Sequence, residues 1–287
     1  MANLKEIRSR ITSVGATMQI TSAMKMVSAS KLKKAQDAII QMRPYANKLS
    51  ELLENLSASL DSSDGGIYSL EREVKKVLLI TITSNRGLCG GFNTYIIKST
   101  KALINNEYKS AKVDILSIGK KSSDHFTKNG FRVNSTHDQL FADLSFDNIS
   151  KIAEDIMQQF VKGSYDKVVL VYNQFKNAAT QIIMNENYLP IQTTKNKERA
   201  AGDYLFEPTK QEIVEQLIPK SLKTQLFKAV LDSHAAEHGA RMTAMHKATD
   251  NAGELKNELT LTYNKARQAA ITAEILEIVG GAEALNG

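Results

Sequence analysis

The chain has 287 residues, of which 42% are hydrophobic, only 6% are aromatic and none is Trp, and its formal net charge is +6. Its single cysteine, Cys89, excludes an internal disulfide framework and fits a reducing compartment. No apolar run approaches the about 20 residues that span a bilayer, and no signal-peptide core or cleavable segment is evident at the N-terminus. The length allows one large domain or two smaller ones.

The first 60 residues predict one long helix with an apolar seam, meaning a row of residues that faces a partner helix. Alternating steps of three and four residues connect the seam, and fourteen of its seventeen positions are apolar. This 3.5-residue repeat is typical of a helix that pairs with another helix, and the helix would be roughly 90 Å long at 1.5 Å per residue. Pro44 is expected to kink it or to loosen one turn. The seam consists of Leu4, Ile7, Ile11, Val14, Met18, Thr21, Lys25, Ser28, Leu32, Ala35, Ile39, Met42, Ala46, Leu49, Leu53, Leu56 and Leu60.

Positive charge is concentrated at the start of this helix. Residues 1–34 contain seven basic residues against one acidic residue, Glu6, so this segment carries an excess equal to that of the whole chain. Two interpretations remain open: a solvated helix face, or a face that meets an acidic partner surface. Nucleic acid is a weaker candidate, because no aromatic or Gly-rich segment accompanies the charges.

An alternation of strands and helices follows residues 61–66, whose Ser, Asp and Gly composition predicts a linker. Strands separated by helices predict a mostly parallel sheet in a layered, Rossmann-like α/β domain. The predicted strands are residues 74–83, 113–118, 131–134, 167–172 and 181–184, and the predicted helices are residues 94–105, 120–128 and 149–161.

The last part of the chain predicts a second long helix. Residues 193–208 are expected to form an exposed link, and the helix follows Pro208, with Pro219 expected to break or kink it early. From residue 221 to about residue 278 only two tolerated glycines interrupt the helical pattern. The Gly-Gly pair at 280–281 is expected to end the helix.

This second helix carries a seam that is rich in alanine, which lets two backbones approach closely. Large residues on the first helix would fill the remaining space, which favours an antiparallel coiled coil with Ile11 near Ala266. The predicted fold class is therefore α/β plus coiled coil: an antiparallel two-helix coiled coil with an inserted Rossmann-like domain. The predicted seam is Ala252, Leu255, Leu259, Thr262, Ala266, Ala269, Ala273 and Leu276.

Two segments match chemical motifs in part. His234, Glu237 and His238 fit H-x-x-E-H, which places two imidazoles on one helical face as zinc requires. Against zinc, the helix is otherwise alanine-rich and no downstream carboxylate ligand is evident. Two exposed histidines on a long helix are the plainer interpretation, so we predict no metal site.

The second segment, residues 84–93 (SNRGLCGGFN), lies between a predicted strand and a predicted helix, where α/β folds often bind phosphate. It is neither G-x-G-x-x-G nor G-x-x-x-x-G-K-[ST], and its glycines could equally serve a tight turn. Cys89 has no His nearby in sequence, so an inert small residue is favoured over a nucleophile. Because no Ser-His-Asp arrangement, paired carboxylates or C-x-x-C occurs, we predict no catalytic residue and no cofactor.

Six segments along the chain carry recognisable motifs. They are LKEIRSRI at 4–11, QITSAMKMVSA at 19–29, RGLCGGFN at 86–93, AEHGARMTAM at 236–245, YNKARQA at 263–269 and ITAEILEIVGGAEA at 271–284. The last segment fits a C-terminal signature of I/V-T-x-E, then an acid three residues on, then Gly-Ala. On these motifs, which occur in order over the whole chain, the chain resembles the gamma subunit of F-type ATP synthase, of the bacterial type.

The resemblance implies a mechanical role. In that family the two terminal helices form a shaft inside a ring of three alpha and three beta subunits. The α/β domain sits beside the epsilon subunit and on the membrane c-ring, and ion flow turns the ring and the shaft together. The implied protein is a non-catalytic, peripheral subunit on the cytoplasmic face of the bacterial inner membrane, without nucleic acid or cofactor. The implied domains are 1–60, 67–208 and 209–287.

The resemblance also implies contact residues. A rotor must bind each beta subunit and then release it, so these contacts should be few and partly solvated. Loss of one should slow turnover more than it unfolds the shaft. The implied beta-subunit contacts are Met24, Lys25, Arg241, Arg267, Gln268, Thr272 and Glu274, and the implied contacts with the c-ring and epsilon are Tyr204, Leu205 and Glu207. With one cysteine and no inserted dithiol segment, thiol regulation is not expected.

Overall fold

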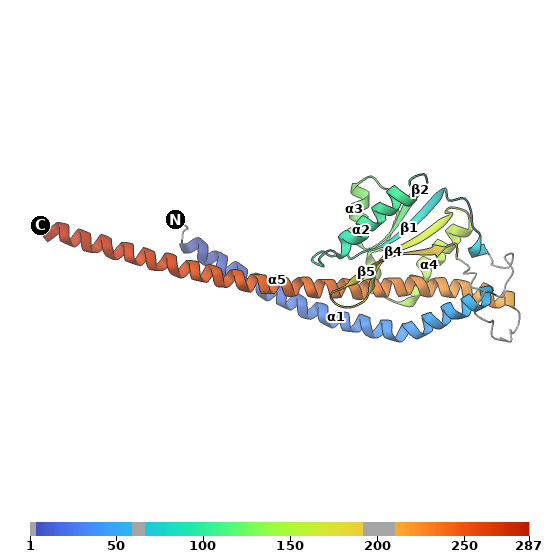
Figure 1. Ribbon diagram of the computed structural model, residues 1–287, viewed down its shortest axis with the longest axis horizontal. Helices are drawn as coiled ribbons and strands as arrows, with labels where there is room; N and C mark the ends of the chain where they lie inside the picture. Colours follow the sequence, from blue (N-terminus) through green and yellow to red (C-terminus); the bar gives the residue numbers. More distant parts are fainter. Residues whose placement is uncertain (1–3, 59–66, 192–209, 287) are drawn as a thin grey trace. The chain divides into compact units, whose positions relative to one another are not determined.

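The computed structural model describes residues 4–58, 67–191 and 210–286. The chain divides into two compact units. One unit is Ser28–Arg241, and the other consists of Met1–Val27 and Met242–Gly287. Two long helices, α1 (Leu4–Ala58) and α5 (Lys210–Asn286), contribute to both units (Figure 1). The predicted linkers at 61–66 and 193–208 fall outside the described residues.

A five-stranded sheet forms the centre of the unit Ser28–Arg241. The strand order is β3-β2-β1-β4-β5, with the first four strands parallel and β5 antiparallel to β4. The prediction of a mostly parallel, Rossmann-like sheet is confirmed. The strands are β1 (Lys76–Ile82), β2 (Lys112–Ile118), β3 (Val133–Thr136), β4 (Lys167–Phe175) and β5 (Gln181–Leu189).

Helices cover both faces of this sheet (Figure 1). On one face lie α2 (Phe92–Ala102), which continues as a π-helix (Leu103–Glu107), and α3 (Lys120–Lys128). On the other face lies α4 (Phe146–Val161), whose first turn is capped by the Ser145 hydroxyl accepting from the Asn148 amide. Two short 3-10 helices, Ile67–Ser69 and Asp138–Ala142, complete the unit.

The strands are apolar on both faces because helices bury both. Along β1, Val77 and Leu79 pack on the α2 side, whereas Leu78, Ile80 and Ile82 pack on the α4 side, and all are fully buried. This near-continuous apolar run is typical of a parallel strand.

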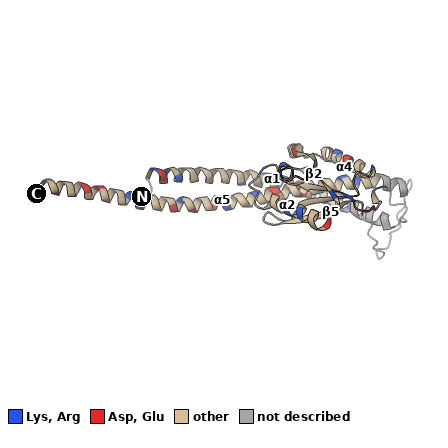
Figure 2. Cartoon of the chain, turned by 90° about the horizontal axis from the view of Figure 1, so that it is seen from above, with Lys and Arg blue, Asp and Glu red and all other residues tan. Residues whose placement is uncertain are grey.

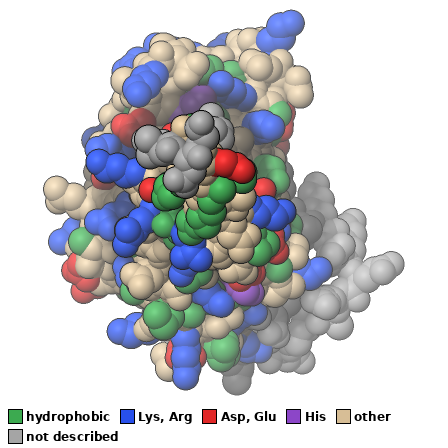
Figure 3. Space-filling model, turned by 90° about the vertical axis from the view of Figure 1, so that its left-hand side faces the viewer, with side chains coloured by type: hydrophobic (Ala, Val, Ile, Leu, Met, Phe, Trp, Pro, Cys, Tyr) green, Lys and Arg blue, Asp and Glu red, His purple; other side chains and the backbone are tan. Residues whose placement is uncertain are grey.

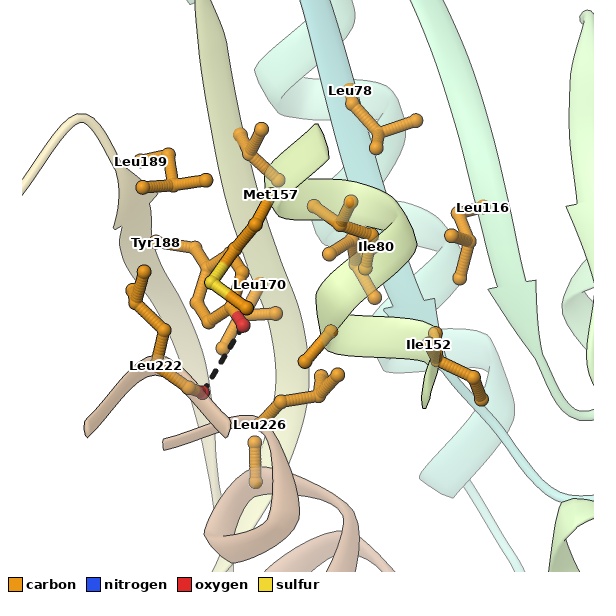
Figure 4. Close-up of a cluster of buried hydrophobic side chains, with 14 of the residues drawn as sticks. Leu78, Ile80, Leu116, Ile152, Met157, Leu170, Tyr188, Leu189, Leu222 and Leu226 are labelled. Atoms are coloured by element: carbon orange, nitrogen blue, oxygen red, sulfur yellow. Dashed lines mark hydrogen bonds between the residues drawn. The ribbon is translucent and has the colours of Figure 1, made fainter. Parts of the chain in front are cut away.

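Part of α5 packs into the same core. Leu222, Leu226 and Val230 belong to the cluster on the α4 side, and the Tyr188 hydroxyl donates to the Leu222 carbonyl at 3.1 Å (Figure 4). Burial raises the pKa of Tyr188 far above its ordinary value, so the phenol stays protonated and keeps this hydrogen bond. The C-terminal helix is therefore anchored to the sheet before it continues beyond residue 241.

Several elements differ in their bounds from the sequence-based prediction, and β5, expected at 181–184, extends to Leu189. The third strand, expected at 131–134, lies at Val133–Thr136, on the edge of the sheet, where its register with β2 is irregular. Helix α5 does not end at 280–281 but continues to Asn286. Strong helix formers follow the two glycines, and neither glycine adopts the left-handed conformation of a helix stop.

Candidate functional site

The unit formed by the two chain termini is an antiparallel helix pair. The Thr249 hydroxyl donates to the Thr21 hydroxyl at 2.8 Å, and the Lys25 Nζ lies 3.4 Å from the His246 Nδ1. One turn further along, a Cβ added to Gly253 would lie 3.8 Å from the Met18 sulfur. Residue numbers rise along one helix as they fall along the other, and the residue numbers of each contacting pair add up to 270 or 271.

The predicted seam of α1 is confirmed. Every seam position from Leu4 to Leu49 is buried or half-buried, including the three polar positions Thr21, Lys25 and Ser28. Side chains of the last seam positions, from residue 53 on, lie outside those described. Two contacts show that α1 and α5 are also antiparallel within the unit Ser28–Arg241: Arg43 lies 3.8 Å from the buried Asp232, and the Lys220 ammonium lies 5.8 Å from the centre of the Tyr45 ring.

The predicted seam of α5 is only partly right. Ala252, Leu259 and Ala266 are buried or half-buried, but Leu255 is 45% exposed and Thr262 is exposed. A helix with 3.6 residues per turn drifts away from a strict 3.5-residue repeat. The side chains of Lys256 and Tyr263, each one residue further on, are half-buried in their place.

The predicted neighbours Ile11 and Ala266 are one heptad out of register. The observed offset places Ala266 opposite Leu4 and Ile11 opposite residues 259–260. Consequently the described residues of α1, which begin at Leu4, include none that pairs with the part of α5 that follows Ala266. The expected seam positions Ala269, Ala273 and Leu276 are all exposed.

This unpaired end of α5, residues 267–286, holds four of the predicted contact residues: Arg267, Gln268, Thr272 and Glu274. All four are exposed, and the Thr272 hydroxyl donates to the Gln268 carbonyl at 2.9 Å. Large apolar side chains are exposed around them, with Ile271 at 49% and Leu276 at 66%. Figure 3 looks onto this end of the chain, where hydrophobic side chains lie beside charged ones. The mixture is suited to contact with another protein.

The other predicted contact pair, Met24 and Lys25, lies on α1. Both side chains are half-buried. Lys25 is the one basic residue of the first 34 that is not exposed; the other six face solvent, and Arg10 among them pairs with Glu6 at 2.9 Å (Figure 2). An exposed basic face fits either of the two sequence interpretations, a solvated surface or contact with an acidic partner.

Arg241 has a different environment from the other predicted contacts. It is 8% exposed, and its guanidinium donates to the Glu237 carboxylate at 2.6 Å and to the carbonyls of Arg86 and Gly87 at 3.1 and 3.3 Å. The expectation of a partly solvated side chain is wrong for this residue. Its assignment as a beta-subunit contact stays a prediction, although these intramolecular bonds already occupy the guanidinium.

The loop at residues 84–93 uses its polar groups internally. Asn93 accepts from the Ser84 amide at 2.9 Å and donates to the Cys89 sulfur at 3.2 Å, and Ser84 donates to the Arg86 carbonyl at 2.6 Å. The turn requires positive φ at Leu88 (61°) and Gly90 (58°). Carbonyls rather than amides face Arg241, so this loop is a docking turn for α5 and does not form a phosphate cradle.

Two features support this assignment of the loop. Cys89 is buried against Phe92 and Ala236, and burial raises the pKa of its thiol, which disfavours a nucleophilic thiolate. At the end of β2, Gly119 has φ 103°, and an added Cβ would clash with the Thr83 carbonyl. The carboxyl ends of β1 and β2 are therefore too tightly packed to admit a ligand at this point.

The H-x-x-E-H motif does not fit a zinc peptidase. The His234 and His238 Nε2 atoms lie 3.2 Å apart, and burial lowers the pKa of His234 to about 4 and that of His238 to about 3, so the imidazoles are neutral at pH 7. Glu237, which would act as the base, is bonded to Arg241 instead. No group of three or more His, Cys, Asp or Glu suited to a metal occurs in residues 4–58, 67–191 and 210–286.

Sequence reasoning missed the role of Arg241 as a link between α5 and the loop. The spacing of Glu237 and Arg241, four residues apart on a helix, was the available signal for an ion pair. The partner carbonyls lie about 155 residues earlier in the chain and carry no sequence signature. The predicted foot residues Tyr204, Leu205 and Glu207 lie outside the described residues, and no described helix is long and apolar enough to cross a bilayer.

Known proteins match this chain over its full length. A family model described as ATP synthase matches residues 3–285. The ATP synthase gamma chain of Flavobacterium johnsoniae is 64% identical over 288 residues, and that of Cytophaga hutchinsonii is 52% identical over 294 residues; each alignment covers 100% of both chains.

Solved structures match as well. One chain in the central stalk and c-ring structure of the Tetrahymena thermophila mitochondrial ATP synthase is 28% identical with a TM-score of 0.61, over 80% of this chain and 99% of that one. One chain in the rotor structure of the Euglena gracilis mitochondrial ATP synthase has a TM-score of 0.68 over 93% of this chain and 98% of that one. At 24% identity the second match supports the fold alone.

Proposed function

Because this chain belongs to the ATP synthase gamma-chain family, we propose that it is the central rotor shaft of a bacterial F-type ATP synthase. In this role it transmits torque between a membrane c-ring and a hexamer of three alpha and three beta subunits, and so couples proton translocation to ATP synthesis. The chain is a subunit of the complex and does no chemistry itself. It sits at the cytoplasmic face of the inner membrane as a peripheral subunit, held there through the complex.

The observation that carries the proposal is the unpaired end of α5. Residues 267–286 continue the helix without a partner from α1, and they expose several large apolar side chains, among them Ile275 at 55% and Ile278 at 66%. An exposed apolar surface of this kind marks a contact with another protein. A ring of subunits around the helix would cover all its sides at once.

The paired region supplies stiffness. The paired region begins where Leu4 of α1 lies opposite Ala266 of α5. Along it the seam buries residues of both helices, so one helix cannot bend without disturbing the other. Further along, α5 is fixed to the sheet core through Leu222 and Leu226, which provides a body against which torque can act. The c-ring and the epsilon subunit are the proposed partners of that body, with the contact residues Tyr204, Leu205 and Glu207 as part of the proposal.

A rotation assay tests this function. The chain is labelled at Lys98→Cys, an exposed position on α2, and assembled with alpha and beta subunits fixed to a surface. Addition of ATP is expected to turn the label in one direction, and a chain shortened after Ala266 is expected to turn with lower torque. An assembly that hydrolyses ATP while the label stays still would refute the shaft.

A binding assay tests the non-catalytic role. Calorimetry on the isolated chain is expected to detect no ATP binding, because the carbonyls of Arg86 and Gly87 face Arg241 and the loop lacks a phosphate-binding lysine. Micromolar ATP binding that disappears in Arg86→Ala or Gly90→Ala would instead assign the chain a nucleotide site.

A further inference from the structure

A polar pocket of about 300 Å³ opens at the amino ends of the parallel strands. This edge of the sheet is opposite to the one that carries the loop at 84–93. Lys76 and Lys112 are the first residues of β1 and β2, and Arg132 comes directly before β3. Asp114, Asn134 and Tyr165 also line the pocket.

The pocket holds more positive than negative charge. Three of its lining residues are cations and one, Asp114, is an anion. Across the described part of the chain, the ammonium groups of Lys76 and Lys112 have no carboxylate within ion-pairing distance. Arg132 is 62% exposed, and its Nε pairs with Asp114 Oδ1 at 3.7 Å, which is too long for a hydrogen bond. The two lysines are therefore available to an anion, and Arg132 can offer one its other N–H groups.

Asp114 places a second requirement on a ligand, namely a hydrogen-bond donor. The residue is only 7% exposed, and its Oδ2 accepts from the Tyr165 hydroxyl at 3.1 Å. Burial and the Asp114 carboxylate raise the pKa of Tyr165 to about 12, so this phenol remains a donor. The other oxygen, Oδ1, has the Arg132 Nε at ion-pairing distance but is buried without any hydrogen-bond donor in the described residues. A buried carboxylate oxygen without a donor is destabilising, so a ligand that supplies one hydrogen would satisfy it.

We propose that this pocket binds inorganic phosphate in a hydrogen-bearing form. Its charged oxygens would accept from Lys76, Lys112 and Arg132, and its P–OH would donate to Asp114 Oδ1. Sulfate has the same shape and charge but carries no hydrogen at neutral pH, so its oxygens would face the carboxylate lone pairs. The pocket should therefore select phosphate over sulfate.

Two more carboxylates on flanking segments do not compete for these cations. Asp166 accepts from the backbone amides of Lys75 and Lys76 at 3.0 and 2.8 Å, and Asp155 accepts from the Gln159 amide at 2.7 Å. Both have donors of their own. They lower the net positive potential, which predicts weak binding, on the order of millimolar.

Calorimetry on the purified full-length chain at pH 8 tests the site. Phosphate is expected to bind with a stoichiometry of one, and sulfate about tenfold more weakly, because a site built to receive a hydrogen rejects an analogue without it. Methyl phosphate separates free phosphate from the phosphate of an ester. It has a pKa of about 6 and is mostly a dianion without hydrogen at pH 8, so it should resemble sulfate.

Variants identify the residues. In Asp114→Asn the remaining oxygen accepts from Tyr165 and an NH2 donor takes the place of Oδ1, so the preference is expected to reverse and sulfate to bind at least as well as phosphate. Lys112→Ala should weaken both anions, whereas the matched control Lys98→Ala removes an exposed lysine outside the pocket and should leave both affinities unchanged. No phosphate binding, equal binding of sulfate, or an unchanged preference in an Asp114→Asn variant with native circular dichroism would each overturn the proposal.

Discussion

Replacement of Arg241 by Met should destabilise the unit Ser28–Arg241 strongly. The substitution keeps the apolar stem but removes a guanidinium that bonds Glu237 and two loop carbonyls. Both side chains of the ion pair are 10% exposed, so the Glu237 carboxylate would remain buried without its cation. Loss of one partner of a buried pair costs about 3–5 kcal/mol, and we expect the free energy of unfolding to fall by that amount at pH 7.5.

The loss in the free energy of unfolding of Arg241→Met should depend on pH. Burial raises the pKa of Glu237 from its ordinary value, and Arg241 opposes this rise. In the variant the opposition is lost, so the folded state binds a proton at a pH where the unfolded glutamate, with a pKa of about 4.3, has released it. Stability therefore falls as pH rises from the unfolded pKa to the folded one. The loss of stability should be smaller near pH 4, where only the loss of the bonds to the two loop carbonyls remains, and complete above the folded pKa of Glu237.

Urea unfolding, followed by near-ultraviolet circular dichroism, measures this effect. Eight of the nine tyrosines fall between residues 28 and 241, so the signal reports on that unit. The control is the double variant Arg241→Met with Glu237→Leu, which buries no unpaired charge and should recover much of the stability with little of the pH dependence. A single variant that loses less than about 1 kcal/mol, or loses the same amount at pH 4 and pH 7.5, would refute the reasoning.

Two further predictions concern the long helices. Gly253→Ala should raise the free energy of unfolding by about 0.5–1 kcal/mol, because its Cβ would meet the Met18 sulfur at an ordinary 3.8 Å. Gly239→Ala should lack this gain, because its Cβ would lie 3.2 Å from the Cα of Ala178. Thermal unfolding of both variants measures the difference in stability. Cysteines at Ile11 and Leu259 should form a disulfide in the assembled complex far more readily than cysteines at Ile11 and Ala266; the reverse result would contradict the observed register.

The α/β layers could be predicted from sequence because the central strands β1, β2 and β4 are short apolar runs buried on both faces over most of their length. β1 and β4 pack between helices, so each is a continuous apolar run that indicates a buried parallel strand. The edge strand β3 was placed two residues early, since its burial alternates weakly and its pairing is irregular. The π-helix at Leu103–Glu107 was not predicted, because nothing in its amino-acid composition distinguishes it from an α-helix.

The candidate site was harder to predict because its contacts join distant parts of the chain. The H-x-x-E-H pattern raised zinc as the weaker of two interpretations, but the residue that decides the chemistry of Glu237 is Arg241, together with two carbonyls that no side-chain pattern can reveal. The polar pocket beside Asp114 was missed for a similar reason. Its lysines begin separate strands, and only the parallel sheet brings those strand starts together.

The register of the helix pair is specified by its polar positions. A heptad repeat predicts which face is buried, but an alanine-rich helix accepts a large residue at several offsets, so the apolar seam alone allows slips of seven residues. At the observed offset Thr21 meets Thr249 and Lys25 meets His246, which also lies 3.3 Å from Asp250.

A slip by one heptad, to the offset expected from the sequence, would place Lys25 against Ala252 and Thr21 against Lys256. Thr21 is 9% exposed, and its hydroxyl also donates to the Met18 carbonyl at 3.1 Å, so the slip would remove only the hydrogen bond that it accepts from Thr249, a net loss of about 0.5–1.5 kcal/mol. Thr21 and Lys25, which interrupt the apolar seam, therefore weaken it locally and select one register among several. That register leaves residues 267–286 of α5 unpaired, so the polar interruption of the seam determines how much helix is available to a surrounding ring.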